Sequence, residues 1–363
     1  MKKILHVVGA RPNFMKIAPV MTAVEAAGGL EQRLVHTGQH YDEKMAEVFF
    51  RDLGLPRPDR DLEVGSGSQA EQTAAILVRF EEALREEAPD LVVVVGDVNS
   101  TLAASLVAAK AQVPVAHVEA GLRSFDLSMP EEINRMVTDR LSSVLLTPSP
   151  DGDANLRKEG VPEERIHFVG NVMIDTLLRH RERAPWEAVR DRFGLTERRY
   201  AVLTLHRPAN VDAPASFSRI LNRLEPLARE FPIVFPIHPR TARRIAENGL
   251  EAEAAFLRRT DPLGYLDFLA MMDHAAFLLT DSGGIQEEAT VLGVPCFTLR
   301  DNTERPVTIE QGTNTLVGAD ARELPAAFEE FRRTGGKRGR IPEKWDGAAG
   351  TRVADVLREF LKV

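Results

Sequence analysis

Three acidic side chains, Asp97, Glu119 and Glu131, stand where apolar runs end and helical patterns begin. Because the carboxyl ends of parallel strands meet at one edge of a sheet, we expect these carboxylates to lie close together. Simpler roles exist for two of them: Asp97 as a helix cap, and Glu131 as a partner of a helix dipole and of Arg135 one turn further on. Neighbouring carboxylates acquire separate pKa values, which is how a protein obtains an acid and a base. The pattern therefore predicts proton-transfer chemistry.

A second group of residues has the chemistry of a phosphate site. Ser282, Gly283 and Gly284 follow an apolar run and open a helix, so bare backbone N–H groups and the helix dipole face an anion. Glu288 lies one turn further on and is suited to accept hydrogen bonds from ribose hydroxyls, and Arg305 follows the next strand. A glycine pair here also fits a plain turn, but the added serine and glutamate favour a nucleotide diphosphate.

Basic side chains follow other predicted strands. Arg11 and Lys16 flank the start of the first helix, which indicates an anion site or a solvated loop. His206 and His238 each come directly after a strand and close to an arginine, which favours contacts with a polyanion or a sugar. These histidines do not have the spacing of a metal pair on a helix, so no metal is predicted.

The elements that position these residues alternate along the whole chain. Continuously apolar runs at 3–9, 32–37, 91–96, 115–118, 144–148, 200–205, 233–237, 277–280 and 294–299 are typical of strands buried on both faces of a parallel sheet. Amphipathic segments of helical length, such as 69–87, 101–111, 216–230 and 285–292, separate them. This alternation predicts an α/β protein with two doubly wound, Rossmann-like domains. We place the domain boundary near residue 170.

Composition limits the class of protein further. The chain has 363 residues, enough for two domains, with 44% hydrophobic and 28% charged residues and a formal net charge of −8. An acidic balance argues against a nucleic-acid partner, and no apolar run is long enough to cross a membrane. The single cysteine, Cys296, lies in an apolar run and excludes an intrachain disulfide framework. A cytoplasmic location is therefore expected.

Taken together, these segments resemble the bacterial non-hydrolysing UDP-N-acetylglucosamine 2-epimerase family. The matching blocks run in the family's order from residue 9 to about 306 and read GARPNFMKIAPV, TGQHYD, GDVNST, HVEAGLRS, PEEINR, LTLHRPAN, IHPR, TDSGGIQEEA and RDNTERP. Two departures stand out. Pro208 and Ala209 replace the family's usual Arg-Glu after His-Arg, and the loop before Glu131 is shorter than the common version.

The resemblance implies a GT-B-like fold with the active site between two domains and a terminal helix that returns to the first. It assigns residues 1–169 and 347–363 to an N-terminal domain with the acid/base residues, and 170–346 to a UDP-binding domain. It implies interconversion of UDP-GlcNAc and UDP-ManNAc through elimination of UDP to a 2-acetamidoglucal and re-addition. Neither NAD nor a metal is needed, and a homodimer is expected.

The resemblance also assigns roles to individual residues. The catalytic residues are Asp97, Glu119, Glu131 and His206, and the division of labour among the carboxylates stays open. Substrate-binding positions are Arg11, Lys16, Arg135, His238, Phe268, Ser282, Gly283, Gly284, Glu288 and Arg305. Phe268 fits either an aromatic near the uracil or a core position. Gln39 and His40 match part of an allosteric substrate site of some members.

Alternative functions remain at this stage. A hydrolysing 2-epimerase or an epimerase of a modified UDP-HexNAc would share every block. A GT-B glycosyltransferase would share the UDP site but would not need three carboxylates and Lys16 in the first half. A nucleotide-sugar sensor is disfavoured because carboxylates near a diphosphate cost binding energy.

Overall fold

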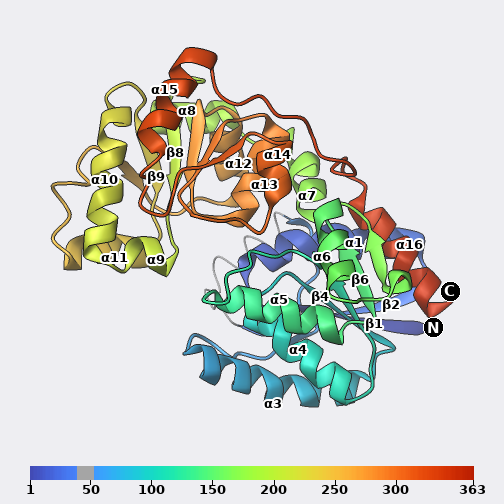
Figure 1. Ribbon diagram of the computed structural model, residues 1–363. Helices are drawn as coiled ribbons and strands as arrows, with labels where there is room; N and C mark the ends of the chain where they lie inside the picture. Colours follow the sequence, from blue (N-terminus) through green and yellow to red (C-terminus); the bar gives the residue numbers. More distant parts are fainter. Residues whose placement is uncertain (39–52) are drawn as a thin grey trace. The chain divides into compact units, whose positions relative to one another are not determined.

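The structure is a computed structural model that describes residues 1–38 and 53–363 (Figure 1). The chain forms two compact units, one made of Met1–Arg179 and Glu343–Val363 and the other of His180–Pro342. Each unit is built on its own parallel sheet, so each buries its own core. The α/β class and the GT-B-like architecture of two doubly wound sheets are confirmed.

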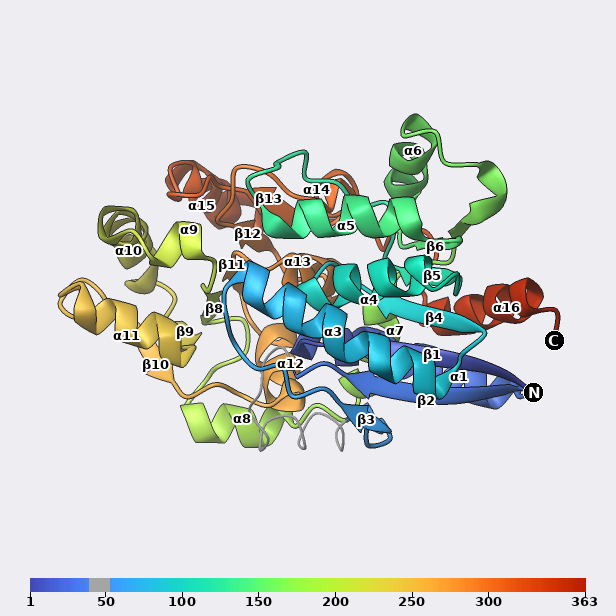
Figure 2. The same cartoon turned by 90° about the horizontal axis from the view of Figure 1, so that it is seen from below.

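The described part of the first unit holds a seven-stranded parallel sheet in the order β3-β2-β1-β4-β5-β6-β7. The strands are β1 (Lys2–Val8), β2 (Leu30–His36), β3 (Arg60–Asp61), β4 (Leu91–Val95), β5 (Val115–Val118), β6 (Val144–Thr147) and β7 (Ile166–Phe168). The helices are α1 (Arg11–Ala27), α3 (Gln69–Glu87), α4 (Asn99–Lys110), α5 (Pro130–Leu141), α6 (Pro150–Lys158), α7 (Val172–Arg181) and α16 (Ala349–Leu361). The helices α3, α4 and α5 lie side by side on one face, and α1 and α16 pack together on the other (Figures 1 and 2).

The second unit holds a six-stranded parallel sheet in the order β10-β9-β8-β11-β12-β13. The strands are β8 (Ala201–Thr204), β9 (Ile233–Pro236), β10 (Arg258–Thr260), β11 (Phe277–Thr280), β12 (Cys296–Thr298) and β13 (Asn314–Leu316). The helices are α8 (Trp186–Phe193), α9 (Pro208–Val211), α10 (Pro214–Ala228), α11 (Pro239–Glu247), α12 (Tyr265–Asp273), α13 (Gly283–Leu292), α14 (Pro306–Glu310) and α15 (Leu324–Thr334).

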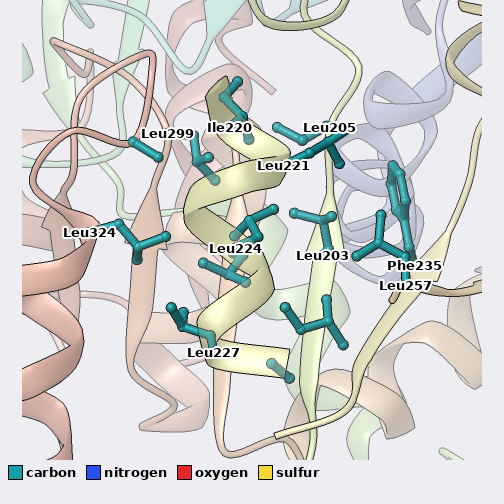
Figure 3. Close-up of a cluster of buried hydrophobic side chains, with 14 of the residues drawn as sticks. Leu203, Leu205, Ile220, Leu221, Leu224, Leu227, Phe235, Leu257, Leu299 and Leu324 are labelled. Atoms are coloured by element: carbon teal, nitrogen blue, oxygen red, sulfur yellow. The ribbon is translucent and has the colours of Figure 1, made fainter. Parts of the chain in front are cut away.

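The helix α10 shows how the core of the second unit is built. Its buried residues, which include Ile220, Leu221 and Leu224, have the spacing of one helix face. This face packs on side chains of the sheet such as Leu203 and Phe235 (Figure 3). Each fully buried side chain of this size contributes about 1.5–3 kcal/mol. A rigid sheet held in this way fixes the loops at the carboxyl ends of its strands.

The first unit ends ten residues later than expected, at 179/180 rather than 169/170. The chain re-enters the first unit at 342/343. The contacts of α7 account for the difference. The Thr176 hydroxyl donates to the carbonyl of Met15 at 2.6 Å, and the Asp175 carboxylate accepts the backbone N–H groups of Ala349 at 3.1 Å and Gly350 at 2.6 Å. The helix α7 thus ties α1 to the start of α16 within the first unit.

Candidate functional site

Lys16 and Glu119 form a buried ion pair at the carboxyl edge of the first sheet. Lys16 lies on α1, and Glu119 directly follows β5. Asn13 connects the two strand exits nearby, because its side chain accepts from the backbone N–H of Ala10 at 3.0 Å and donates to the carbonyl of Val95 at 3.0 Å. Burial of a charge is costly, and pairing of the ammonium with the carboxylate offsets that cost for both groups.

Backbone conformation makes room for this pair. Glu119 has φ +74°, a left-handed conformation that costs a non-glycine residue about 1–2 kcal/mol. Gly96, at the end of β4, has φ +68°, and a Cβ there would stand 3.0 Å from Lys16 Nζ and 3.3 Å from a Glu119 oxygen. Strain of this kind persists when the surrounding structure over-determines it, which is common at functional sites.

Asp97 and Glu131, the other two predicted acidic residues, have surroundings that differ from those of Glu119. Asp97, half-buried after β4, forms an ion pair with Arg135 of α5, and Arg135 also pairs with Glu132. Arg135 is buried between the two carboxylates. Glu131 stands half-buried in the first turn of α5, and within residues 1–38 and 53–363 no donor reaches its carboxylate. The three acids thus have three distinct electrostatic environments.

A buried cluster of side chains connects the ends of β4 and β5. His117 lies between the carbonyl of Gly96, 2.8 Å from Nε2, and the carboxylate of Asp139, 2.7 Å from Nδ1. Asp139 also accepts the backbone N–H of Gly121 at 3.1 Å and pairs with Arg123 at 2.7 Å. Burial alone would raise the pKa of Asp139, but the hydrogen bond with His117 and the nearby charges hold it below its ordinary value.

In the second unit, His206 faces the buried carboxylate of Asp281. The ring Nδ1 lies 2.9 Å from Asp281 Oδ1, while the His206 side chain is 55% exposed. Asp281 is fully buried and also accepts the backbone N–H of Arg207 at 2.9 Å and the side-chain amide of Asn210 at 3.1 Å. A hydrogen bond to one ring nitrogen fixes the orientation of the imidazole.

The predicted phosphate site forms the N-terminus of α13. Ser282 is the N-cap residue, and Gly283 and Gly284 form the first turn with a partly exposed backbone. Gly283 packs against a buried ion pair between Arg305 and Glu304, since a Cβ there would stand 2.4 Å from Arg305 Nη1. Because glycine has no side chain, the Arg305 guanidinium can lie against the start of α13. The guanidinium and the helix N-terminus both attract an anion.

Glu288 lies further along α13 and is almost fully buried. Burial raises its pKa to about 8, although a hydrogen bond from the Tyr265 hydroxyl at 3.2 Å acts in the opposite direction and Glu287 adds to the rise. Glu287 pairs with Arg305 at 2.9 Å. Phe268 is half-buried on α12.

Two further predicted positions lie at the starts of helices. His238 is the exposed N-cap residue of α11, and its Nδ1 accepts the backbone N–H of Arg240 at 3.2 Å. Arg11 is the first residue of α1. Gln39 and His40 lie outside the described residues. Among the residues that the structure describes, no group of three His, Cys, Asp or Glu side chains is arranged to hold a metal ion.

Two buried carboxylates that hold these residues were not predicted, whereas the pairing of Glu132 with Arg135 follows from their spacing on one helix. Asp281 and Asp139 each accept hydrogen bonds from the backbone of a predicted site residue or of its neighbours. A signal for Asp281 exists in the sequence, because it separates a buried strand from Ser-Gly-Gly and is an expensive residue at such a position unless it is paired. Asp139 lies in the last turn of α5 and looks like a surface charge in the sequence.

Two parallel sheets with these loops at their carboxyl edges define an α/β protein of the GT-B-like fold. Sucrose-phosphate synthase of Thermosynechococcus elongatus shares the fold alone, with a TM-score of 0.61 at 13% identity over 99% of this chain and 94% of that one. No helix in the described residues has the length and apolar character to span a membrane.

Closer relatives define the family. The family model described as UDP-N-acetylglucosamine 2-epimerase matches residues 22–358. A Methanocaldococcus jannaschii protein of that name is 42% identical over 98% of each chain, and its crystal structure with UDP-GlcNAc and UDP has a TM-score of 0.92, covering 98% of this chain and 99% of that one. The Pseudomonas aeruginosa UDP-2,3-diacetamido-2,3-dideoxy-D-glucuronate 2-epimerase is 40% identical over 99% of this chain and all of its own. This chain belongs to the UDP-N-acetylglucosamine 2-epimerase family.

Proposed function

We propose that this protein catalyses the reversible epimerisation of UDP-GlcNAc to UDP-ManNAc at C2. The observation that carries the proposal is a set of three carboxylates at one edge of one sheet: Asp97 and Glu119 directly after β4 and β5, and Glu131 in the first turn of α5. Two of them are paired with different cations, Arg135 and Lys16, and the third has no donor among the described residues. Membership of the epimerase family supports the same reaction.

The reaction needs one group to remove a proton and another to return one. A base takes the C2 proton, the C1–O bond breaks, and UDP leaves with the bonding electron pair, giving 2-acetamidoglucal. Delivery of a proton to the opposite face of C2 and return of the UDP oxygen to C1 complete the inversion. We assign the proton transfers to Asp97, Glu119 and Glu131, and assistance to the departing diphosphate to His206.

The second unit supplies the UDP-binding groups in this proposal. The backbone N–H groups at Ser282, Gly283 and Gly284 receive the diphosphate at the start of α13. Around them we assign His238 and Arg305 to phosphate, Glu288 to ribose and Phe268 to uracil, with Arg11, Lys16 and Arg135 of the first unit as further substrate contacts. Gln39 and His40 are kept as candidates for an allosteric substrate site.

Incubation of the purified protein with UDP-GlcNAc in D₂O tests the proposal. We expect UDP-ManNAc with deuterium at C2, with no added NAD and with turnover unchanged by EDTA. Absence of label at C2 would refute epimerisation, and free ManNAc with UDP would indicate the hydrolysing relative. Asp97→Asn or Glu131→Gln should lower turnover by about 10²-fold or more with UDP binding retained. Asp212→Asn, which removes a half-buried carboxylate of the second unit that pairs with Arg240, is the matched control.

A second candidate is an epimerase of a modified, acidic UDP-sugar. The Pseudomonas aeruginosa relative, named for a diacetamido uronate substrate, is almost as similar to this chain as the Methanocaldococcus jannaschii protein, at 40% and 42% identity. The two candidates differ in whether the sugar carries a carboxylate. Comparison of kcat/KM for UDP-GlcNAc and for the diacetamido uronate under the same D₂O conditions distinguishes them.

We also propose a homodimer in the cytoplasm. Large apolar side chains are exposed along α5 and in the loop before it, namely Phe125, Leu127, Ile133, Met136 and Val137. Ile133, Met136 and Val137 share one face of the helix by their spacing, which is the pattern of a buried interface. The free thiol of the buried Cys296 is consistent with a reducing compartment.

A further inference from the structure

We propose that Asp281 is a positioning residue for His206: it fixes the proton on Nδ1 of the imidazole, so that Nε2 is the nitrogen that exchanges a proton with the leaving diphosphate. This inference rests on the proposed function, because it assigns the way in which His206 assists the departure and return of UDP. Its structural basis lies entirely within the second unit.

The pairing of two strands brings the two residues together. β8 and β11 are parallel neighbours in which Thr204 is in register with Thr280, and their hydroxyls are 2.6 Å apart. Asp281 is the next residue after β11, and His206 is the second residue after β8. The sheet therefore fixes the main-chain positions from which the two side chains meet at 2.9 Å.

The hydrogen-bond partners of Asp281 show which atom carries the proton between the two side chains. The carboxylate accepts the backbone N–H groups of His206 at 3.0 Å and Arg207 at 2.9 Å, and the side-chain amide of Asn210 at 3.1 Å. All of these groups are donors, so Asp281 acts as an acceptor toward each of them. The Nδ1 of His206 must then be a donor too.

The electrostatics of Asp281 agree with this geometry. Burial alone would raise its pKa, but the interaction with His206 and the two backbone N–H groups hold the pKa below its ordinary value. Asp281 therefore remains a carboxylate and does not take the proton of the ring. Arg207 follows His206 in the chain, and its guanidinium lies 4.0 Å from the Glu304 carboxylate.

A fixed Nδ1–H has a direct chemical consequence. In the neutral ring the lone pair is on Nε2, and in the imidazolium Nε2 carries a transferable proton. When the C1–O bond breaks, the electron pair stays on the diphosphate oxygen, and Nε2–H donates to that oxygen. On re-addition the proton returns to Nε2 as the C1–O bond forms again. Asp281 accepts the Nδ1–H in both protonation states of the ring and stabilises the imidazolium form, so it acts through His206 rather than on the substrate.

The tautomer can be measured in the wild-type protein without any reaction. In ¹⁵N-histidine-labelled protein, with the His206 signals assigned from their loss in His206→Gln, we expect the neutral ring of His206 to be protonated on Nδ1. Protonation on Nε2 instead would overturn the proposal. Because this readout needs no turnover, it separates failure of the inference from failure of the proposed function, which would appear as a wild-type enzyme that incorporates no deuterium.

A double-mutant cycle tests the catalytic consequence. We expect Asp281→Asn to lower kcat by about 10²-fold or more, with UDP affinity retained and with the His206 titration moved to lower pH. In the His206→Gln background the same change should have little further effect, since the group that it positions is already lost. Equal losses in both backgrounds would mean that Asp281 only holds the loop. If Asp281→Asn does not fold, the ¹⁵N measurement decides alone, and Asp212→Asn serves as the control for loss of a carboxylate.

Discussion

Glu288 makes the stability of the second unit depend on pH in a direction that is unusual for a carboxylate. Its pKa is raised from 4.5 to about 8, chiefly by burial. A group whose pKa is raised on folding contributes stability that is complete below its unfolded pKa and is lost as pH rises toward the folded one. The second unit should therefore lose stability between about pH 4.5 and 8, because unfolding releases a proton that the folded state retains. Glu288→Gln removes the proton and should remove this dependence.

The size of the effect follows from the two pKa values. In this range each pH unit changes the free energy of unfolding by about 1.4 kcal/mol. Between about pH 5.5 and 7.5, wild type should lose about 2.5 kcal/mol relative to Glu288→Gln, and above about pH 8 the difference should stop growing. The amide keeps the size of the side chain and its acceptor for the Tyr265 hydroxyl, so packing changes little.

The two tryptophans allow each unit to be followed separately. Trp186 lies in the second unit and Trp345 in the first, so 5-fluorotryptophan gives one ¹⁹F signal for each during urea unfolding. We expect the Trp186 transition to show the growing difference and the Trp345 transition to be unaffected. Glu253→Gln, at an exposed carboxylate of the same unit, should behave as wild type at every pH. A difference between Glu288→Gln and wild type that is constant with pH would refute the reasoning.

Three further changes test other parts of the molecule. Lys16→Met leaves Glu119 buried without its cation and should destabilise the first unit by about 3–5 kcal/mol, read from the Trp345 signal; wild-type stability would contradict the buried pair. Gly96→Ala places a Cβ 3.0 Å from Lys16 Nζ at φ +68°, so it should lower the free energy of unfolding by at least about 1–2 kcal/mol and lower turnover. The control Gly160→Ala is also at positive φ but has no atom within 4 Å of the added Cβ, so turnover should be unchanged. Ile133→Glu combined with Met136→Glu should convert a dimer into monomers in light scattering, and a mass unchanged from wild type would exclude this face as the interface.

The strands that could be predicted from the sequence are the central ones. All nine apolar runs correspond to strands of the structure, from β1 to β12, and their bounds agree to within about two residues. Within residues 1–38 and 53–363, the strands that were not predicted are β3, β7, β10 and β13, which are the edge strands of the two sheets. An edge strand is short and has one neighbour, so it need not be continuously apolar. The sequence of β10, Arg258–Thr260, carries no apolar residue at all.

The sequence indicated which residues of the candidate site stand at strand ends, but it did not indicate which side chains pair with one another. A strand end marks Asp97, Glu119 and the Ser-Gly-Gly turn because local pattern determines where strands end. The partners of these residues lie elsewhere in the chain, as with Arg135 for Asp97, or Asp281 for His206. Which loops meet depends on the order of the strands, and that order is set by packing of the whole sheet rather than by any one segment. Charges with a buried partner therefore look like surface charges until the topology is known.

The segment after His206 shows how a departure from the family pattern can leave its structural role intact. Pro208 stands at the first position of α9, where a missing N–H group costs nothing, so this replacement favours the helix start. Asn210, which the chain shares with the family, donates to Asp281 at 3.1 Å and to the carbonyl of Leu299 at 3.1 Å. These bonds fix α9 to the ends of β11 and β12. The hydrogen bonds that Asp281 accepts from this segment therefore come from the backbone of His206 and Arg207 and from Asn210, and none of them involves residue 208 or 209.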